Sequence, residues 1–300
     1  MALSCSCKDN AITRYDYNIK KYVALPEKIS TDVVKTKDFE KFFDEFTKNA
    51  VMNKGVSTQS TEAEATEGST VGITINGVAS GAEQAELTVG DKTFKYGDMS
   101  AELTGKKGGD VFEYVFESID GTTLNLAVTV DYVRVYELND STAQLMGYSD
   151  KKDAENKLKL QAEDEFIINS LVEKSEIKEY PEKEYTELFE ARKNYYTQLA
   201  SAYGNSLDEY LKKENITKQQ FEVMLDKHVK ETMKKELPVY AYARLQKIKL
   251  TQEDINKKAE EIAKQNGGTA TEVFEQTPLR DIELLAVKEA VLKVIKEESK

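Results

Sequence analysis

The sequence is poor in several residue types that carry chemistry. Its 300 residues include no tryptophan, four prolines, one histidine and two cysteines. Both cysteines, Cys5 and Cys7, fall within the first seven residues, which excludes a disulfide framework and cysteine catalysis in the rest of the chain. The single histidine, His228, has no second histidine or cysteine near it in sequence, so we expect neither a metal site nor Ser-His-Asp chemistry there.

Long apolar runs and excess positive charge are also missing. No stretch of about 18 apolar residues is present, so we expect no helix that crosses a bilayer. The formal net charge is −12, which disfavours nucleic acid as a partner because it repels phosphate backbones. The glycine-rich segment Gly105–Asp110 lacks the spacing of a phosphate-binding loop. We therefore predict no cofactor.

Residues 1–15 are interpreted as an N-terminal tether. The first ten, MALSCSCKDN, resemble the end of a bacterial lipoprotein signal, with small and apolar residues, a cysteine and then a polar segment. A lipid on Cys5 would place the protein outside the cytoplasm, anchored at the bacterial cell envelope through the lipid alone. The alternative is a cytoplasmic protein with two incidental thiols.

Residues 16–50 are predicted to form a connecting arm and a helix. Pro26 favours an extended backbone over Tyr22–Leu25, because proline restricts the residue before it. Four aromatic residues at helical spacing then mark the apolar face of a helix: Phe39, Phe42, Phe43 and Phe46. The following residues 56–70 are rich in serine, threonine and glutamate, which predicts a surface linker.

Residues 51–138 are predicted to form a β domain. Apolar residues alternate over Val71–Ile75 and again over Leu124–Val130, the pattern of half-buried strands. A short helix is expected around Ala101–Leu103, and Asp120-Gly121 is typical of a hairpin turn.

Residues 139–300 carry apolar stripes on charged segments, which predicts helices to the end of the chain. Capping boxes predict helix starts at Ser206, Thr217 and Thr251. Pro238 lies inside one helical pattern and is expected to break or kink that helix. The fold class is therefore α+β.

The serial order of motifs resembles bacterial trigger factor over about residues 20–300. In residues 202–275 a Ser-Leu-Asp-Glu helix start precedes ELPVYAYA and then LTQEDI, in the order of the family's C-terminal chaperone domain. The segment Leu87–Asp110, LTVGDKTFKYGDMSAELTGKKGGD, is similar to the family's FKBP-like domain. The resemblance implies a small FKBP-like antiparallel β domain and an elongated all-helical chaperone domain. The family's ribosome-docking domain has no counterpart here, so ribosome docking is not expected.

The resemblance also implies a prolyl-isomerase pocket, and here the sequence departs from the family. Ile75 stands where the family has a tyrosine, Asp98 or Met99 replaces the platform aromatic, and Leu126 replaces a phenylalanine on the last strand. We therefore assign no catalytic residue. The aromatic residues that are left form either a reduced proline pocket or a small core beneath a turn. The remnants of the pocket are Phe94, Tyr96, Met99 and Leu126.

The function implied by the resemblance is ATP-independent binding of unfolded or nascent polypeptides by the helical domain. Tyrosine and methionine side chains suit this role because they pack against varied apolar segments. The candidate client-binding residues are Tyr195, Tyr196, Tyr203, Tyr210, Phe221 and Met224. Two alternatives stay open: a peptidyl-prolyl cis-trans isomerase with residual activity, and an envelope-anchored interaction protein with one dedicated partner.

Overall fold

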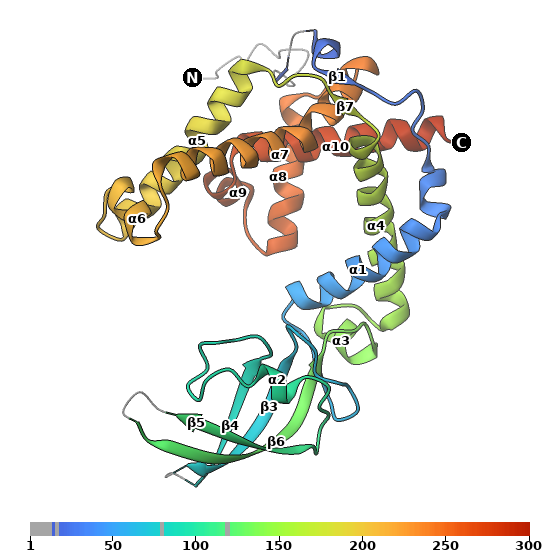
Figure 1. Cartoon of the computed structure of the whole chain (residues 1–300). Helices are drawn as coiled ribbons and strands as arrows, with labels where there is room; N and C mark the ends of the chain where they lie inside the picture. The colour runs from blue at the N-terminus through green and yellow to red at the C-terminus, as the bar shows by residue number, and fades with distance from the viewer. Residues whose placement is uncertain (1–13, 16–17, 79–80, 118–120) are drawn as a thin grey trace. The chain divides into compact units, whose positions relative to one another are not determined.

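A computed structural model describes residues 14–15, 18–78, 81–117 and 121–300 (Figure 1). The chain folds into two compact units. The sheet unit is Glu40–Ala162, and the helical unit combines the residues up to Phe39 with Glu163–Lys300. Cys5, the predicted lipidation site, lies outside the described residues, and the envelope location stays a prediction. In the described part of the chain, no helix is long and apolar enough to cross a membrane.

The sheet unit is built on five antiparallel strands. They are β2 (Thr58–Ser60), β3 (Thr70–Val78), β4 (Gly81–Thr88), β5 (Val111–Glu117) and β6 (Thr123–Val135). Their order is β2-β6-β3-β4, and β5 pairs with the same strand β6 over Thr123–Thr129. Because β6 is long, β2 pairs with its far end at Val133–Val135.

The alternation of apolar residues along the strands produces the core of the sheet unit. Ile73 and Ile75 of β3 are fully buried beside Val128 and Val130 of β6, because successive strand residues point to opposite faces. The helix α2 (Ser100–Leu103) contributes Leu103 to the same core. The predicted strands and short helix are confirmed.

The predicted surface linker over residues 56–70 is only partly correct. Thr58–Ser60 forms the edge strand β2, and Ala65 is fully buried in the core of the sheet unit. The sequence of β2 is polar, so its strand character comes from pairing with residues of β6 more than seventy positions away.

Three helices complete the sheet unit or continue out of it: α1 (Lys37–Asn53), α3 (Asp140–Leu145) and α4 (Lys151–Glu173). Phe43 and Phe46 of α1 pack with Val51, Ala143 and Leu158 in a small separate core. The boundaries between the two units fall within α1 and within α4. The predicted domain limits at residues 50, 51, 138 and 139 stay predictions.

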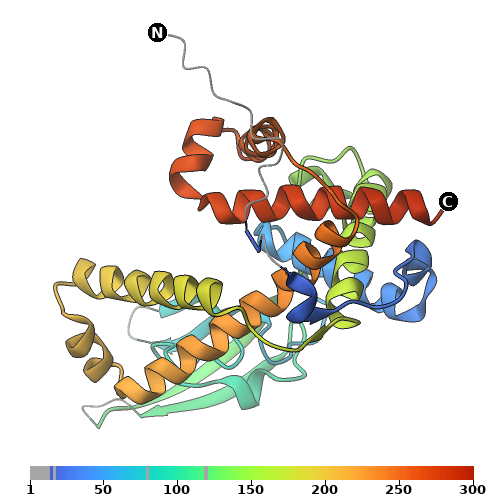
Figure 2. The same ribbon diagram turned by 90° about the horizontal axis from the view of Figure 1, so that it is seen from above.

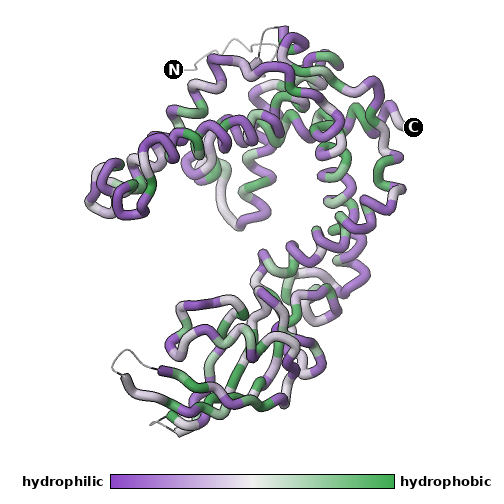
Figure 3. Tube along the Cα trace, in the orientation of Figure 1, coloured by the Kyte–Doolittle hydropathy of each residue, from purple (hydrophilic) through white to green (hydrophobic). Residues whose placement is uncertain are grey.

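In its described residues, the helical unit contains two short 3-10 helices, a two-stranded ribbon and six further helices. These are η1 (Ile19–Lys21), β1 (Val23–Ala24), η2 (Thr31–Lys35), β7 (Glu176–Ile177), α5 (Glu182–Ala202), α6 (Leu207–Lys213), α7 (Lys218–Leu245), α8 (Gln252–Asn266), α9 (Ala270–Gln276) and α10 (Leu279–Glu298). The predicted extended segment around Val23 is confirmed as β1, which pairs with β7. Hydrophobic and hydrophilic residues alternate along the helices, as the amphipathic pattern predicts (Figure 3).

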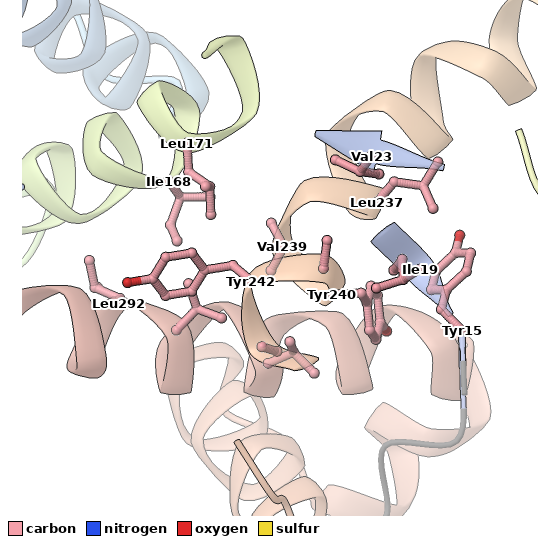
Figure 4. Packing of buried hydrophobic residues seen from close by; sticks show 14 of the residues in the cluster. Tyr15, Ile19, Val23, Ile168, Leu171, Leu237, Val239, Tyr240, Tyr242 and Leu292 are labelled. Carbon is pink, nitrogen blue, oxygen red and sulfur yellow. The ribbon is translucent and has the colours of Figure 1, made fainter. Parts of the chain in front are cut away.

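The core of the helical unit incorporates the N-terminal segment. Tyr15 and Val23 are buried against α7, and the Tyr15 and Tyr240 rings meet edge to face with centroids 5.1 Å apart (Figure 4). Ile168 of α4 and Leu292 of α10 belong to the same core. Residues from both ends of the chain therefore stabilise one hydrophobic cluster.

Local signals located three of the six α-helix starts in the described part of this unit. Capping boxes are present at Ser206, Thr217 and Thr251, as predicted, and at Thr269 as well. Pro238 does not break its helix, since α7 continues through it to Leu245. The observed architecture confirms the α+β fold class.

Candidate functional site

The candidate client-binding residues all lie on one projection of the helical unit, which we call the long arm. It consists of α5, α6 and the first half of α7, from Lys218 to Thr232. Helices α5 and α7 run side by side with α6 at their far ends (Figures 1 and 2). The arm has a small core of its own, in which Leu211, Phe221 and Leu225 are buried.

Several predicted residues serve this internal core. Phe221 is 3% exposed, and its ring packs edge to face on Tyr196 with centroids 5.4 Å apart. Tyr196 and Tyr210 are half-buried against the same cluster. The placement of Phe221 among client-binding residues is therefore corrected, because a side chain that fills the arm's own core is not available to a client.

The remaining predicted residues face outward. Tyr203 is 71% exposed, Tyr195 53% and Met224 38%. Val223, which the sequence analysis did not select, is 63% exposed beside Met224. The arm thus keeps a buried core and also presents large apolar side chains to solvent, where they can contact another polypeptide.

A hydrogen bond fixes the base of the long arm. The Tyr185 hydroxyl of α5 donates to Asp226 Oδ1 of α7 at 2.8 Å. Lys230 and Tyr185 lower the pKa of Asp226 through hydrogen bonds, with the lysine contributing most. Burial, assisted by Asp226, raises the pKa of Tyr185 to about 12. The tyrosine therefore stays a protonated donor at neutral pH.

A crevice of about 480 Å³ lies beside this base and includes the exposed Tyr195. His228 lies in it, next to the Arg192 guanidinium. Desolvation and Arg192 lower the pKa of His228, so the imidazole is neutral at pH 7. Among the described residues, no three histidine, cysteine or acidic side chains form a metal-binding group. The lining residues are Arg14, Glu187, Leu188, Ala191, Arg192, Tyr195, His228, Val229, Thr232, Pro278, Arg280 and Asp281.

A larger cleft of about 890 Å³ lies between α4, α7 and α10. Its apolar lining consists of Ile168, Val172, Leu285 and Leu292. Its charged lining carries both signs: Asp164, Glu165, Glu173, Glu231 and Glu289, with Lys234, Lys235 and Lys288. The volume falls within the range of protein ligand sites. This cleft could not be predicted from the sequence, because three helices far apart in sequence form it.

A second projection, the short arm, consists of α8, α9 and the start of α10. Ile255, Ala259 and Val273 are buried in its own core, together with Ile282. Phe274 and Leu279 are exposed. The short arm therefore repeats the organisation of the long arm.

Buried polar groups hold the helices from which both arms project. Glu236 of α7 forms an ion pair with Arg280 of α10, and both side chains are largely removed from solvent. The Tyr240 hydroxyl of α7 donates to Glu283 Oε1 of α10 at 3.0 Å. Burial is the main cause that raises the pKa of Glu283. A buried ion pair or hydrogen bond that loses one partner costs stability, so these contacts favour the observed packing of α7 against α10.

The four pocket remnants of the sheet unit come together in its core. Met99 and Leu126 are buried, and Phe94 and Tyr96 are half-buried against the same cluster. The Tyr96 hydroxyl donates to Glu83 Oε2 at 3.0 Å, and its ring packs edge to face on Phe116. Because Met99 and Leu126 are inaccessible, they cannot contact a proline ring at the surface.

One comparison with known protein families covers most of the helical unit. Residues 149–297 match the family model described as the C-terminus of bacterial trigger factor protein. Among solved structures, a trigger factor chaperone described for promiscuous substrate recognition in folding and assembly is 18% identical. That match covers 94% of this chain and 72% of the other chain, with a TM-score of 0.29. No curated protein sequence matches the chain. The family match spans both arms and the large cleft.

Proposed function

We propose that this chain, a trigger factor-like protein with the family's C-terminal chaperone domain, holds unfolded or partly folded polypeptides without ATP. The exposed apolar residues of the two arms make the first contacts with a client, and the α4–α7–α10 cleft accepts an apolar segment of it. The observation that supports this proposal most strongly is the separation of roles on the long arm. Leu211, Phe221 and Leu225 form the arm's core, whereas Tyr203 and Val223 face solvent.

The chemistry of these surfaces fits varied clients. Tyrosine offers a large apolar area with a polar tip, and methionine adapts its shape to its neighbour. The lining of the cleft combines carboxylates, lysines and apolar side chains, so it can face segments of either charge. A surface of this kind recognises apolar character rather than a fixed sequence.

Aggregation of chemically unfolded clients, followed by light scattering, tests the proposal. We expect the purified chain to suppress aggregation of several unrelated clients at stoichiometric ratios. The double variant Tyr203→Ser, Val223→Ser removes two of the most exposed apolar side chains of the arm, so several-fold more protein should be needed. A matched control, Gln198→Ser with Gln219→Ser, changes exposed polar residues of the same arm, one on α5 and one on α7, and should act like the unmodified protein.

Failure of the unmodified chain to suppress aggregation of any client would overturn the proposal. Equal activity of the two double variants would instead show that the exposed residues of the long arm have no role in client binding. Thermal unfolding of each variant checks that the folded population is the same. We expect no difference, because neither pair of substitutions touches the arm's core.

A further inference from the structure

Strand β5 forms a free edge of the sheet. Its residues pair with β6 in a regular antiparallel register, from Val111 with Thr129 to Glu117 with Thr123. Among the residues that the structure describes, no backbone hydrogen bond joins the other edge of β5. A free edge presents unpaired N–H and C=O groups to which another extended chain can bond.

One face of β5 is already occupied within the sheet unit. Phe112, Tyr114 and Phe116 are half-buried against its core. The Tyr114 hydroxyl donates to the carbonyl oxygen of Asp98 at 3.2 Å. These contacts hold the strand in place, so its edge is a fixed template.

The opposite face alternates apolar and acidic side chains. Val111 is 61% exposed and Val115 is 59% exposed. Glu113 and Glu117 lie between and beyond them, exposed and without an ion-pair partner in the described ranges. Lysine, proline and bulges commonly keep an edge strand from pairing with another chain. Strand β5 contains none of these, since its sequence is VFEYVFE.

This pattern argues against a second copy of the chain as the occupant. Pairing β5 with its own copy in an antiparallel register centred on Glu113 places two glutamates opposite each other. A register centred on Val115 places Glu113 opposite Glu117. The register centred on Tyr114 avoids these pairs but still gathers four carboxylates on one face. Like charges at such spacing are destabilising, and each copy also carries a net charge of −12.

We propose that the free edge of β5 binds an extended polypeptide segment in which every second residue is, in turn, a lysine or arginine and an apolar residue, because only every second residue of a strand lies on the same face. The segment adds a strand to the sheet, and its backbone groups bond to the unpaired edge. Its cations lie across from Glu113 and Glu117, and its apolar side chains cover Val111 and Val115. This peptide site belongs to the sheet unit and does not depend on the client-binding proposal for the arms.

Fluorescence anisotropy with the full chain tests the proposal. The probe, the Lys-Val peptide, is a fluorescein-labelled, amidated peptide of two Lys-Thr-Val-Thr repeats, so that lysine and valine alternate on one face of the extended chain. Its control, the Glu-Val peptide, has glutamate in place of both lysines. A third peptide carries N-methyl groups on alternate amides along one edge, with a fourth methylated along the other edge. We expect saturable binding of the Lys-Val peptide, no binding of the Glu-Val peptide, and loss of binding with at least one methylated peptide, because methylation removes the N–H donors.

Charge reversal locates the site. The variant Glu113→Lys, Glu117→Lys should weaken binding of the Lys-Val peptide by about tenfold or more, since two favourable cross-strand pairs become repulsive. The control variant Glu40→Lys, Glu45→Lys makes the same change in net charge on exposed positions of α1 and should bind normally. The arm variant Tyr203→Ser, Val223→Ser should also bind normally.

Equal binding of the methylated and unmethylated peptides would overturn the proposal, because charge alone would then explain the affinity. Equal weakening by the two charge-reversal variants would overturn it for the same reason. The experiment with the methylated peptides is done with the unmodified protein. It therefore remains decisive if a charge-reversal variant fails to fold.

Discussion

The Tyr185 hydroxyl donates a 2.8 Å hydrogen bond to Asp226 and joins the first turn of α5 to the middle of α7. This pair lies at the base of the long arm, away from the exposed Tyr203 near its tip. It therefore sets how firmly the arm's two long helices are held together.

Replacing Tyr185 by phenylalanine should lower the free energy of unfolding by about 1 kcal/mol, the typical net value of one hydrogen bond. Urea unfolding followed by circular dichroism measures this change. Tyr195→Phe is the matched control, because the Tyr195 hydroxyl has no hydrogen-bond partner in the part of the chain that the structure describes. Equal stability of the two variants would show that the Tyr185–Asp226 bond contributes nothing.

Phe221 and Met224 lie three positions apart on α7 but should respond very differently to truncation. Phe221→Ala empties the core of the long arm and should cost about 3–5 kcal/mol. Met224→Ala removes an exposed side chain, so its cost should stay within about 0.5 kcal/mol. Denaturant unfolding of both variants checks this difference. A small effect at Phe221 would contradict the assignment of this residue to the core.

Much of this organisation is local in origin and could be predicted from the sequence. The capping boxes at Ser206, Thr217 and Thr251 depend on side chains three residues apart, so sequence alone revealed them. The alternation around Ile73 likewise indicated a half-buried strand. Such signals need no knowledge of distant parts of the chain.

Features that depend on distant contacts could not be predicted. Glu236 and Glu283 look like ordinary charged residues on helices, yet both are buried because α7 packs against α10. The apolar residues at helical spacing around Phe221 predicted an apolar face on this helix. The pattern could not show whether α6 or solvent covers that face. The polar strand β2 and the large cleft could not be predicted for the same reason. Strand β2 pairs with the distant β6, and the cleft is lined by three helices that are far apart in sequence.

Glu283 should make stability depend on pH. Its pKa is raised in the folded state, mainly by burial, so its stabilising contribution is full below the unfolded value of about 4.3 and is lost as pH rises through the folded value. Glu283→Gln removes this dependence and keeps an acceptor for Tyr240. The melting temperature of the variant minus that of the unmodified protein should therefore increase from about pH 4 to pH 7.

The exposed control Glu260→Gln should show a difference that varies little over the same range of pH. A difference for Glu283→Gln that stays constant with pH, or that falls as pH rises, would contradict the assignment.

The sheet unit should have little prolyl-isomerase activity. Met99 and Leu126 are buried and Tyr96 is bonded to Glu83, so these side chains cannot surround a proline ring. In a protease-coupled assay with a proline peptide, the unmodified chain and Phe94→Ala should both give rates close to the uncatalysed rate. Robust turnover that Phe94→Ala abolishes would instead establish a working pocket.

Site-specific photo-crosslinking tests the central claim, that the exposed face of the long arm holds unfolded polypeptide. A benzophenone amino acid is placed at position 203 or 223, and as a control at the exposed position 35 of η2. After illumination with an unfolded client, adducts should form at 203 and 223, far exceed those at 35, and disappear when the client is folded. Equal adducts at all three positions, or none with any unfolded client, would contradict the account.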